Sequence, residues 1–342
     1  MLALVAAAAV SLPASADAVL SVEHASGLRA LLEKAGAYAP SLSPQSVGAT
    51  LRDRVGVDLL AEAGAWGLAP RGARLLAFGR DAVGLVAPVR DRKAARKQLA
   101  AWVAERERRV ARISGGRLFT ASGRGAQALL AGMLRPAPLP AELRERARGQ
   151  VWLWARLDEP LRAAVLAIDA SGIGLVARGL LTARGPLLAG PAPAGCASGV
   201  ACLRAGVAEA GRSAIALTLA RIGAAAQPEL AGAARVEERV DGIDVRALSD
   251  RASLARALRI TPVFGSTASA GPALEGRIDL AEVDAALASL TPLDAIRGGF
   301  AAGAYAVHAV YGVLLRNAGP LTLAGSPARG NAAEIELRLP LR

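Results

Sequence analysis

The residues whose types could do chemistry are mainly basic, and they gather between positions 90 and 112. This stretch holds nine Arg or Lys residues and three acidic ones, and nine minus three gives a net charge of +6, half of the +12 of the 342-residue chain. Leu99, Trp102 and Val103 recur at helical spacing, which predicts one basic amphipathic helix over about 92–112. Seven basic residues are candidates for contact with an anionic surface: Arg92, Lys93, Arg96, Lys97, Arg106, Arg108 and Arg109.

The sequence leaves three interpretations of this basic helix open. The helix could rest on anionic lipid or lipopolysaccharide head groups, or it could be a solvated outer face above an apolar stripe that packs in the core. Nucleic acid is the third, but aromatic residues make up only 3% of the chain, and base stacking requires them. Nearly all the basic residues are Arg, as codon bias in a GC-rich genome would produce, so the charge by itself argues only weakly for an anionic partner.

The sequence contains none of the familiar catalytic motifs. Its two histidines, His24 and His308, have no partner nearby in sequence for general-base or metal chemistry. We expect His24 in a loop and His308 as a hydrogen-bonded core or interface residue. The G-x-S-x-G, S-x-x-K, P-loop and H-E-x-x-H patterns are all missing. We therefore predict no catalytic residue, no metal and no cofactor, and an enzyme with an unfamiliar site stays open as an alternative.

The two cysteines are spaced for a small disulfide loop. Cys196 and Cys202 lie six positions apart in a stretch rich in Gly, Ala and Pro. In an oxidising compartment they could pair, and otherwise they are two free thiols. Two thiols without nearby His or further Cys do not complete the four ligands of a structural zinc site.

The first sixteen residues have the layout of a secretory signal peptide. An uncharged apolar run from Met1 to Val10 is followed by Pro13 and by the triplet at 14–16, whose alanines suit the small pockets of a signal peptidase. We expect cleavage after Ala16 and export to the periplasm or the cell envelope. No Lys or Arg precedes the apolar run, so a buried first helix is the alternative, and it is too short to span a bilayer comfortably.

The rest of the chain alternates strands and helices. Strands are expected at 18–22, 151–157, 173–177 and 333–341, with a hairpin at 74–78 and 83–89, and helices are expected from 26, over 44–63, 92–112 and 161–168, and from about 280. Strands joined mainly through hairpins predict an α+β fold with a largely antiparallel sheet and helices packed on one face. The order recurs, which suggests two diverged repeats over 17–148 and 149–342, with a loop or linker at about 185–206.

Residues 298–315 form an uncharged stretch of eighteen residues with a single His. Its length is near that of a transmembrane helix, but Gly and Ala dominate it, so insertion would be weakly driven. We expect a buried helix under the final hairpin, with membrane association as the alternative.

Three features resemble a loose group of exported proteins of GC-rich Gram-negative bacteria that have no assigned reaction. They are the start of the mature chain at 16–20, the step from strand to acid at 87–91, and the closing strand at 333–341. The resemblance spans most of the chain and implies an envelope or periplasmic location, but no functional residue. We predict an exported, non-enzymatic protein that binds lipid or another anionic envelope component. The alternative is a structural or assembly protein that binds another envelope protein.

Overall fold

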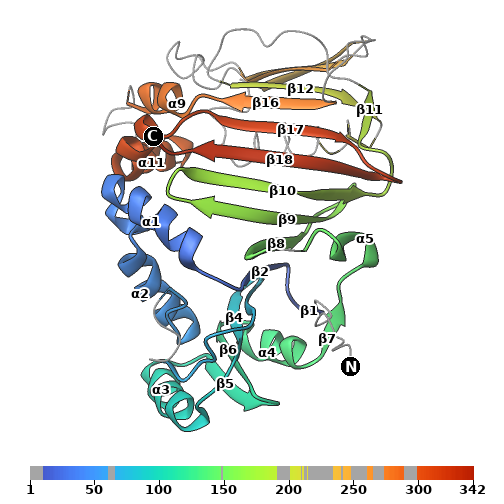
Figure 1. The fold of residues 1–342 in the computed structure, drawn as a ribbon. Helices are drawn as coiled ribbons and strands as arrows, with labels where there is room; N and C mark the ends of the chain where they lie inside the picture. Colours follow the sequence, from blue (N-terminus) through green and yellow to red (C-terminus); the bar gives the residue numbers. More distant parts are fainter. Residues whose placement is uncertain are drawn as a thin grey trace, which may run out of the picture. The chain divides into compact units, whose positions relative to one another are not determined.

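The computed structural model describes residues 11–60, 66–147, 149–190, 201–208, 210–211, 214, 234–239, 242–247, 260–264, 273–288 and 299–342. The chain divides into two compact units, each taken by itself below (Figure 1). The first unit comprises Met1–Glu33, Ser41–Leu157 and Ala163–Ser171, and the second comprises Lys34–Pro40, Asp158–Arg162 and Gly172–Arg342. These bounds differ from the repeat halves expected at 17–148 and 149–342, and the repeat itself stays a prediction.

The first unit is built on an antiparallel sheet in the order β9-β8-β2-β3-β4-β6-β5. The strands are β2 (Ala18–Val22), β3 (Arg74–Gly79), β4 (Ala82–Pro88), β5 (Arg109–Ser114), β6 (Arg117–Gly123), β8 (Val151–Arg156) and β9 (Leu161–Ser171). The predicted hairpin is confirmed as β3 and β4, with Leu76 opposite Leu85. The helix predicted over 161–168 is wrong, because this segment pairs as β9 with β8. Short apolar runs fit either periodicity, and here a neighbouring strand decided the outcome.

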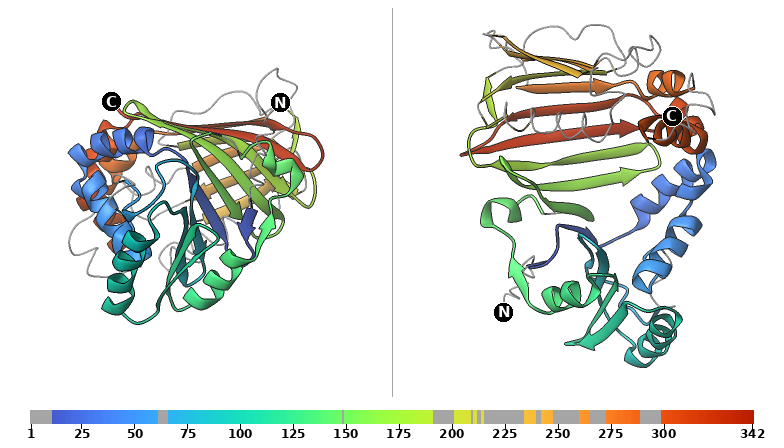
Figure 2. Two further views of the ribbon diagram at one scale, coloured as in Figure 1. Left: turned by 60° about the horizontal axis from the view of Figure 1, so that its bottom comes forward. Right: turned by 180° about the vertical axis from the view of Figure 1, so that it is seen from behind.

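Helices cover both faces of this sheet rather than one. Helices α2 (Pro44–Val55) and α3 (Arg92–Glu105) pack on the face that carries Leu85 and Leu118, in the main core of the unit. Helix α4 (Ala126–Leu134) packs on the opposite face, where a Cβ atom added to Gly84 would lie 2.7 Å from the methyl carbon of Met133. Figure 2 (left) shows α3 and α4 on either side of the strands.

Two helices end earlier than the sequence predicts. Helix α2 stops at Val55, because Gly56 adopts a left-handed conformation (φ 79°) and its N–H donates to the Arg52 carbonyl. Helix α3 stops at Glu105, Arg106 is extended, and β5 begins at Arg109. The prediction of one basic helix to residue 112 is therefore wrong. The apolar residues that follow α3, Val110 and Ile113, lie in a strand that pairs with β6.

The N-terminal described residues belong to the first unit. Strand β1 (Ser11–Pro13) pairs antiparallel with β7 (Pro136–Pro138), and Ala16 is fully buried. Cleavage after Ala16 would therefore remove β1 and its pairing. Residues 1–10 of the predicted signal peptide lie outside the described residues. The first unit also holds α5 (Ala141–Arg144), whereas the residues of α1 (Ser26–Tyr38) and of the 3-10 helix Pro40–Leu42 are divided between the two units.

The second unit also rests on a largely antiparallel sheet, in the order β11-β12-β16-β17-β18-β10, with β15 parallel to β12. Its elements are β10 (Gly174–Ala183), β11 (Leu188–Gly190), β12 (Ala201–Val207), β15 (Ile260–Phe264), β16 (Leu274–Ile278), β17 (Leu321–Pro327), β18 (Ala332–Pro340), the separate hairpin β13 (Ala234–Arg239) and β14 (Gly242–Ala247), α9 (Leu280–Leu287) and α11 (Gly299–Asn317). The predicted closing hairpin is confirmed as β17 and β18. The α+β class with antiparallel sheets is confirmed with it.

Helix α11 is the uncharged segment predicted at 298–315, and that prediction of a buried helix is wrong. Val307, Val310 and Val313 keep 42%, 48% and 46% of their surface exposed. Their spacing places them on one side of the helix, so the apolar stripe faces solvent in the described structure. Within the described residues, no helix combines the length and the hydropathy needed to cross a membrane.

Candidate functional site

Four of the seven predicted basic residues lie together on α3. Arg92, Lys93, Arg96 and Lys97 are all exposed in the first two turns of the helix. Their spacing confines them to an arc of about 140°, at roughly 100° per residue, so they share one side of the helix. We call these four side chains the cationic face. The neighbouring arc of the helix carries Ala95, Leu99 and Trp102, which are buried in the first unit.

The cationic face is placed where its charges disfavour the helix. The N-terminus of a helix already carries a positive partial charge, and its first turn contains no acidic residue here. The pairs 92/96 and 93/97 bring like charges one turn apart, which also destabilises a helix. In the described part of the chain, none of the four side chains forms a salt bridge. The arrangement costs stability and leaves four cations available to an anionic partner.

Asp91 makes the helix possible at this position. Its Oδ1 accepts hydrogen bonds from the backbone N–H groups of Lys93 (2.9 Å) and Ala94 (3.0 Å). Asp91 is thus the N-cap of α3, and it satisfies two of the otherwise unpaired amides at the start of the helix. The Asp91 carboxylate thus binds backbone amides at the start of α3, and the cationic side chains project from a helix whose N-terminus is capped.

The other three predicted contacts lie beyond the helix. Arg106 and Arg108 are exposed, and Arg108 has a positive φ of 65° in the connection to β5. Arg109 is only 7% exposed and points into the unit. The prediction that Arg109 contacts a surface is therefore wrong, because burial withholds its guanidinium from any surface partner.

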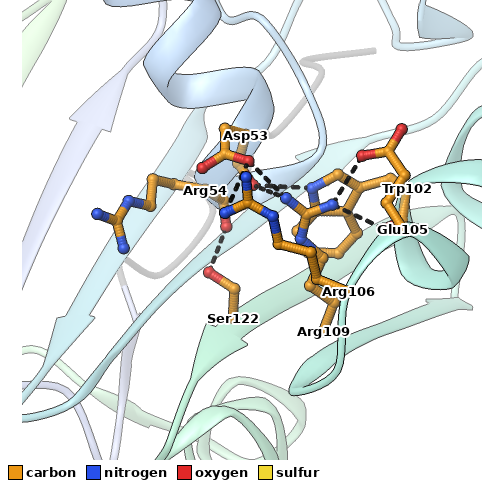
Figure 3. Close-up of polar contacts among 7 residues, drawn as sticks. All are labelled: Asp53, Arg54, Trp102, Glu105, Arg106, Arg109 and Ser122. Carbon is orange, nitrogen blue, oxygen red and sulfur yellow. Dashed lines mark hydrogen bonds and ion pairs between the residues drawn. The ribbon is translucent and has the colours of Figure 1, made fainter.

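Arg109 instead joins α2, α3 and β5 (Figure 3). Its Nη2 donates to Asp53 Oδ1 (2.6 Å) and to the Asp53 carbonyl (2.9 Å), while its Nη1 donates to Glu105 Oε2 (2.8 Å) and to the Trp102 carbonyl (2.9 Å). The guanidinium carbon also lies 4.9 Å from the centre of a Trp102 ring. Because Asp53 and Trp102 lie in the last turns of their helices, the cation meets the negative ends of two helix dipoles.

Neighbouring side chains complete the same anchor. Trp102 Nε1 donates to the Asp53 carbonyl (3.0 Å), Ser122 Oγ donates to the Arg54 carbonyl (2.5 Å), and Thr120 Oγ1 donates to the Val55 carbonyl (2.7 Å). The last three carbonyls of α2 are thereby satisfied by side chains of α3, β5 and β6. All of these groups are bound to one another, so the cluster fixes α3 and its cationic face to the sheet. It has a structural role.

A second polar cluster joins α9 and α11 in the second unit. The carboxylate of Asp284, 1% exposed, contacts His308 Nδ1 through Oδ1 (2.8 Å) and Arg316 Nη1 through Oδ2 (2.6 Å). Gly312 allows this approach, because a Cβ atom there would lie 2.6 Å from Asp284 Oδ1. The sequence analysis found no partner for His308, because Asp284 lies 24 residues away. The hydrogen-bonded role predicted for His308 agrees with this contact. His24 lies exposed between β2 and α1.

Replacing Asp284 with asparagine is expected to lower the free energy of unfolding by roughly 1–2 kcal/mol, because an amide keeps the volume but loses a charge-assisted hydrogen bond. The effect stays moderate because His308 and Arg316 are partly exposed and can be hydrated. Urea denaturation checks this. E282Q, at an exposed acid of the same helix, is the control and should change stability by less than about 0.5 kcal/mol. Equal effects of the two substitutions would contradict the anchoring role of Asp284.

Among the described residues, two side chains have a displaced pKa. Glu336 on β18 accepts hydrogen bonds from Arg338 and Arg178, and these two bonds hold the pKa of its carboxyl below its usual value. Burial lowers the pKa of Arg74, at the start of β3. The carboxyl of Glu336 lies at the sheet surface. It forms a cross-strand ion pair with Arg178, which lies directly opposite it on β10.

The predicted disulfide stays a prediction. Cys202 lies in β12, opposite Arg277 of β16, and Cys196 lies outside the described residues. Within the ranges that the structure describes, no three His, Cys, Asp or Glu residues are grouped as a metal site would require.

Comparisons with known proteins leave the function open. No protein-family model and no curated protein matches the chain. Among solved structures, crystal form III of TP0453 is 12% identical, with a TM-score of 0.30 over 66% of this chain and 86% of that one. Form I is 14% identical (TM-score 0.30, 51% and 80%), and form IV is 13% identical (0.29, 49% and 76%). Likeness at this level carries no inference about function.

Proposed function

We propose that this chain is a non-enzymatic binding protein that docks the cationic face of α3 onto an anionic surface, namely the head groups of anionic lipids. The observation that carries the proposal is the placement of four exposed basic side chains on one side of a helix, without salt bridges in the described structure and at the helix end that disfavours them. Such a placement lowers the stability of the folded chain, and contact with anions would recover the loss.

Binding at this face would be electrostatic. The exposed large apolar side chains of the described residues are Phe78, Ile173, Ile278, Val307, Val310 and Val313, and none of them belongs to α3. The helix would therefore contact head groups without inserting into the acyl layer. Each basic residue near an anionic bilayer contributes about 1 kcal/mol, and this attraction weakens as salt shortens the Debye length.

The test is co-sedimentation of the full chain with vesicles of phosphatidylglycerol and phosphatidylcholine. We expect binding at low ionic strength, weaker binding at about 0.15 M salt, where the Debye length is about 8 Å, and none to phosphatidylcholine alone. Absence of binding to the anionic vesicles at low salt would refute the proposed function.

Export to the envelope is part of the proposal, and the signal-like first sixteen residues support it. Mass spectrometry of the protein from its host is expected to find a mature N-terminus at Asp17 and Cys196 joined to Cys202. That mature chain would lack β1, so β7 would lose its partner strand. A cytoplasmic protein that keeps Met1 and two free thiols would contradict export, and nucleic acid would then be the next anionic partner to test.

Assembly with another protein is a second candidate function, and one observation favours it. Helix α11 presents Val307, Val310 and Val313 to solvent as a continuous apolar stripe. Exposed apolar stripes of this kind are typical of helices that pack against a partner. A stable, stoichiometric complex recovered from envelope extracts would support assembly over lipid binding.

A further inference from the structure

Arg74 is a buried basic residue with no ion pair and only one long hydrogen bond in the described structure. It lies at the start of β3, in register with Val22 of β2, and is 7% exposed. Its Nη2 donates to the Ala69 carbonyl at 3.4 Å, beyond the usual range for such a bond, and its Nε has no hydrogen-bond partner in the described structure. No acidic side chain of the described residues forms a salt bridge with it.

Arg109 is a buried guanidinium of the same unit that has a structural role, and its contacts differ from those of Arg74. The Arg109 side chain is equally buried and makes four hydrogen bonds, two of them to carboxylates. Arg74 makes one long hydrogen bond and no ion pair. A buried cation without a counter-charge is strongly unfavourable, which is why buried charges in proteins are normally paired. The described structure supplies no counter-charge for Arg74.

We propose that Arg74 binds a monovalent carboxylate. The Nε–H and one Nη2–H of a guanidinium point in parallel along one edge, and this edge matches the two oxygens of a carboxylate. In Arg74 this is the edge that lacks a good partner. The residues aligned with Arg74 across β2 and β8 are the apolar, buried Val22 and Val151. One negative charge would neutralise the site, whereas a divalent phosphate would leave a net charge buried.

The test is the stability of the full chain in acetate, compared with chloride at the same ionic strength. A ligand that binds only the folded chain raises the folding equilibrium constant by a factor of one plus the ratio of its concentration to Kd, so acetate at ten times Kd gives about an elevenfold increase. We expect this increase in the wild type and in R80M, which removes an exposed arginine in the β3–β4 turn. We expect none in R74M, which is also expected to be at least as stable as the wild type in chloride.

Two outcomes would overturn the assignment. If acetate stabilises R74M as much as the wild type, the effect is a general property of the salt. If phosphate stabilises the wild type through Arg74 as strongly as acetate does, the site is not selective for a monovalent carboxylate. Should R74M fail to fold, the proposal is tested instead by recording the arginine Nε resonances of the isotopically labelled wild type by nuclear magnetic resonance. The resonance of one buried arginine must shift saturably as acetate is added and stay unchanged in chloride. If no resonance shows this shift, the proposal is refuted.

Discussion

Replacing Arg109 with methionine is expected to lower the free energy of unfolding by about 3 kcal/mol. Methionine keeps much of the volume but removes all four hydrogen bonds, and hydrogen bonds to a charged group contribute roughly 1.5–3 kcal/mol each when buried. The total is smaller than their sum because Asp53 and Glu105 are 41% and 65% exposed, so water screens both ion pairs and hydrates the freed carboxylates. Urea denaturation followed by circular dichroism measures the loss.

Arg106 offers a matched control for this substitution. It reaches the same Asp53 carboxylate at 3.6 Å, but its side chain is 69% exposed. R106M should therefore change stability by less than about 0.5 kcal/mol, as an exposed ion pair does. If R109M also cost less than about 1 kcal/mol, the cluster would not be the anchor of α2 and α3, since a loss of that size is typical of ordinary substitutions.

Neutralising the cationic face is expected to weaken binding to anionic vesicles several hundredfold. The variant R92Q/K93Q/R96Q/K97Q removes four charges, at about 1 kcal/mol each near an anionic bilayer, and every 1.4 kcal/mol is tenfold in affinity. The same variant should be slightly more stable than the wild type, by a few tenths of a kcal/mol or more, because it relieves repulsion at the helix N-terminus. Vesicle co-sedimentation and urea denaturation report the two effects separately.

The matched control lowers the net charge equally at other exposed sites. R80Q/R112Q/R117Q/R124Q also removes four positive charges, and all four of these side chains are exposed in the first unit, outside α3. We expect it to retain most of the vesicle binding. Equal losses in the two quadruple variants would mean that net charge, and not the cationic face, attracts the vesicles.

Local signals in the sequence were sufficient for several parts of this structure. The β3–β4 hairpin follows from two short apolar runs around a Gly-Arg-Asp turn, and β18 follows from strict alternation of apolar and polar residues. The exposure of Lys97 follows from its position on the side of α3 opposite the buried Leu99. Each of these features depends on residues within one or two turns of chain.

The tertiary structure decided what depends on distant residues. Helix α3 ends at Glu105 because the residues after it pair with β6, and residues 161–168 form a strand because β8 lies beside them. Arg109 meets Asp53 from 56 positions away, and His308 meets Asp284 from 24. Sequence spacing does not report such pairs, because folding brings them together through packing of elements that are far apart in the chain. The same is true of Arg74, whose isolation is a property of its surroundings in the fold.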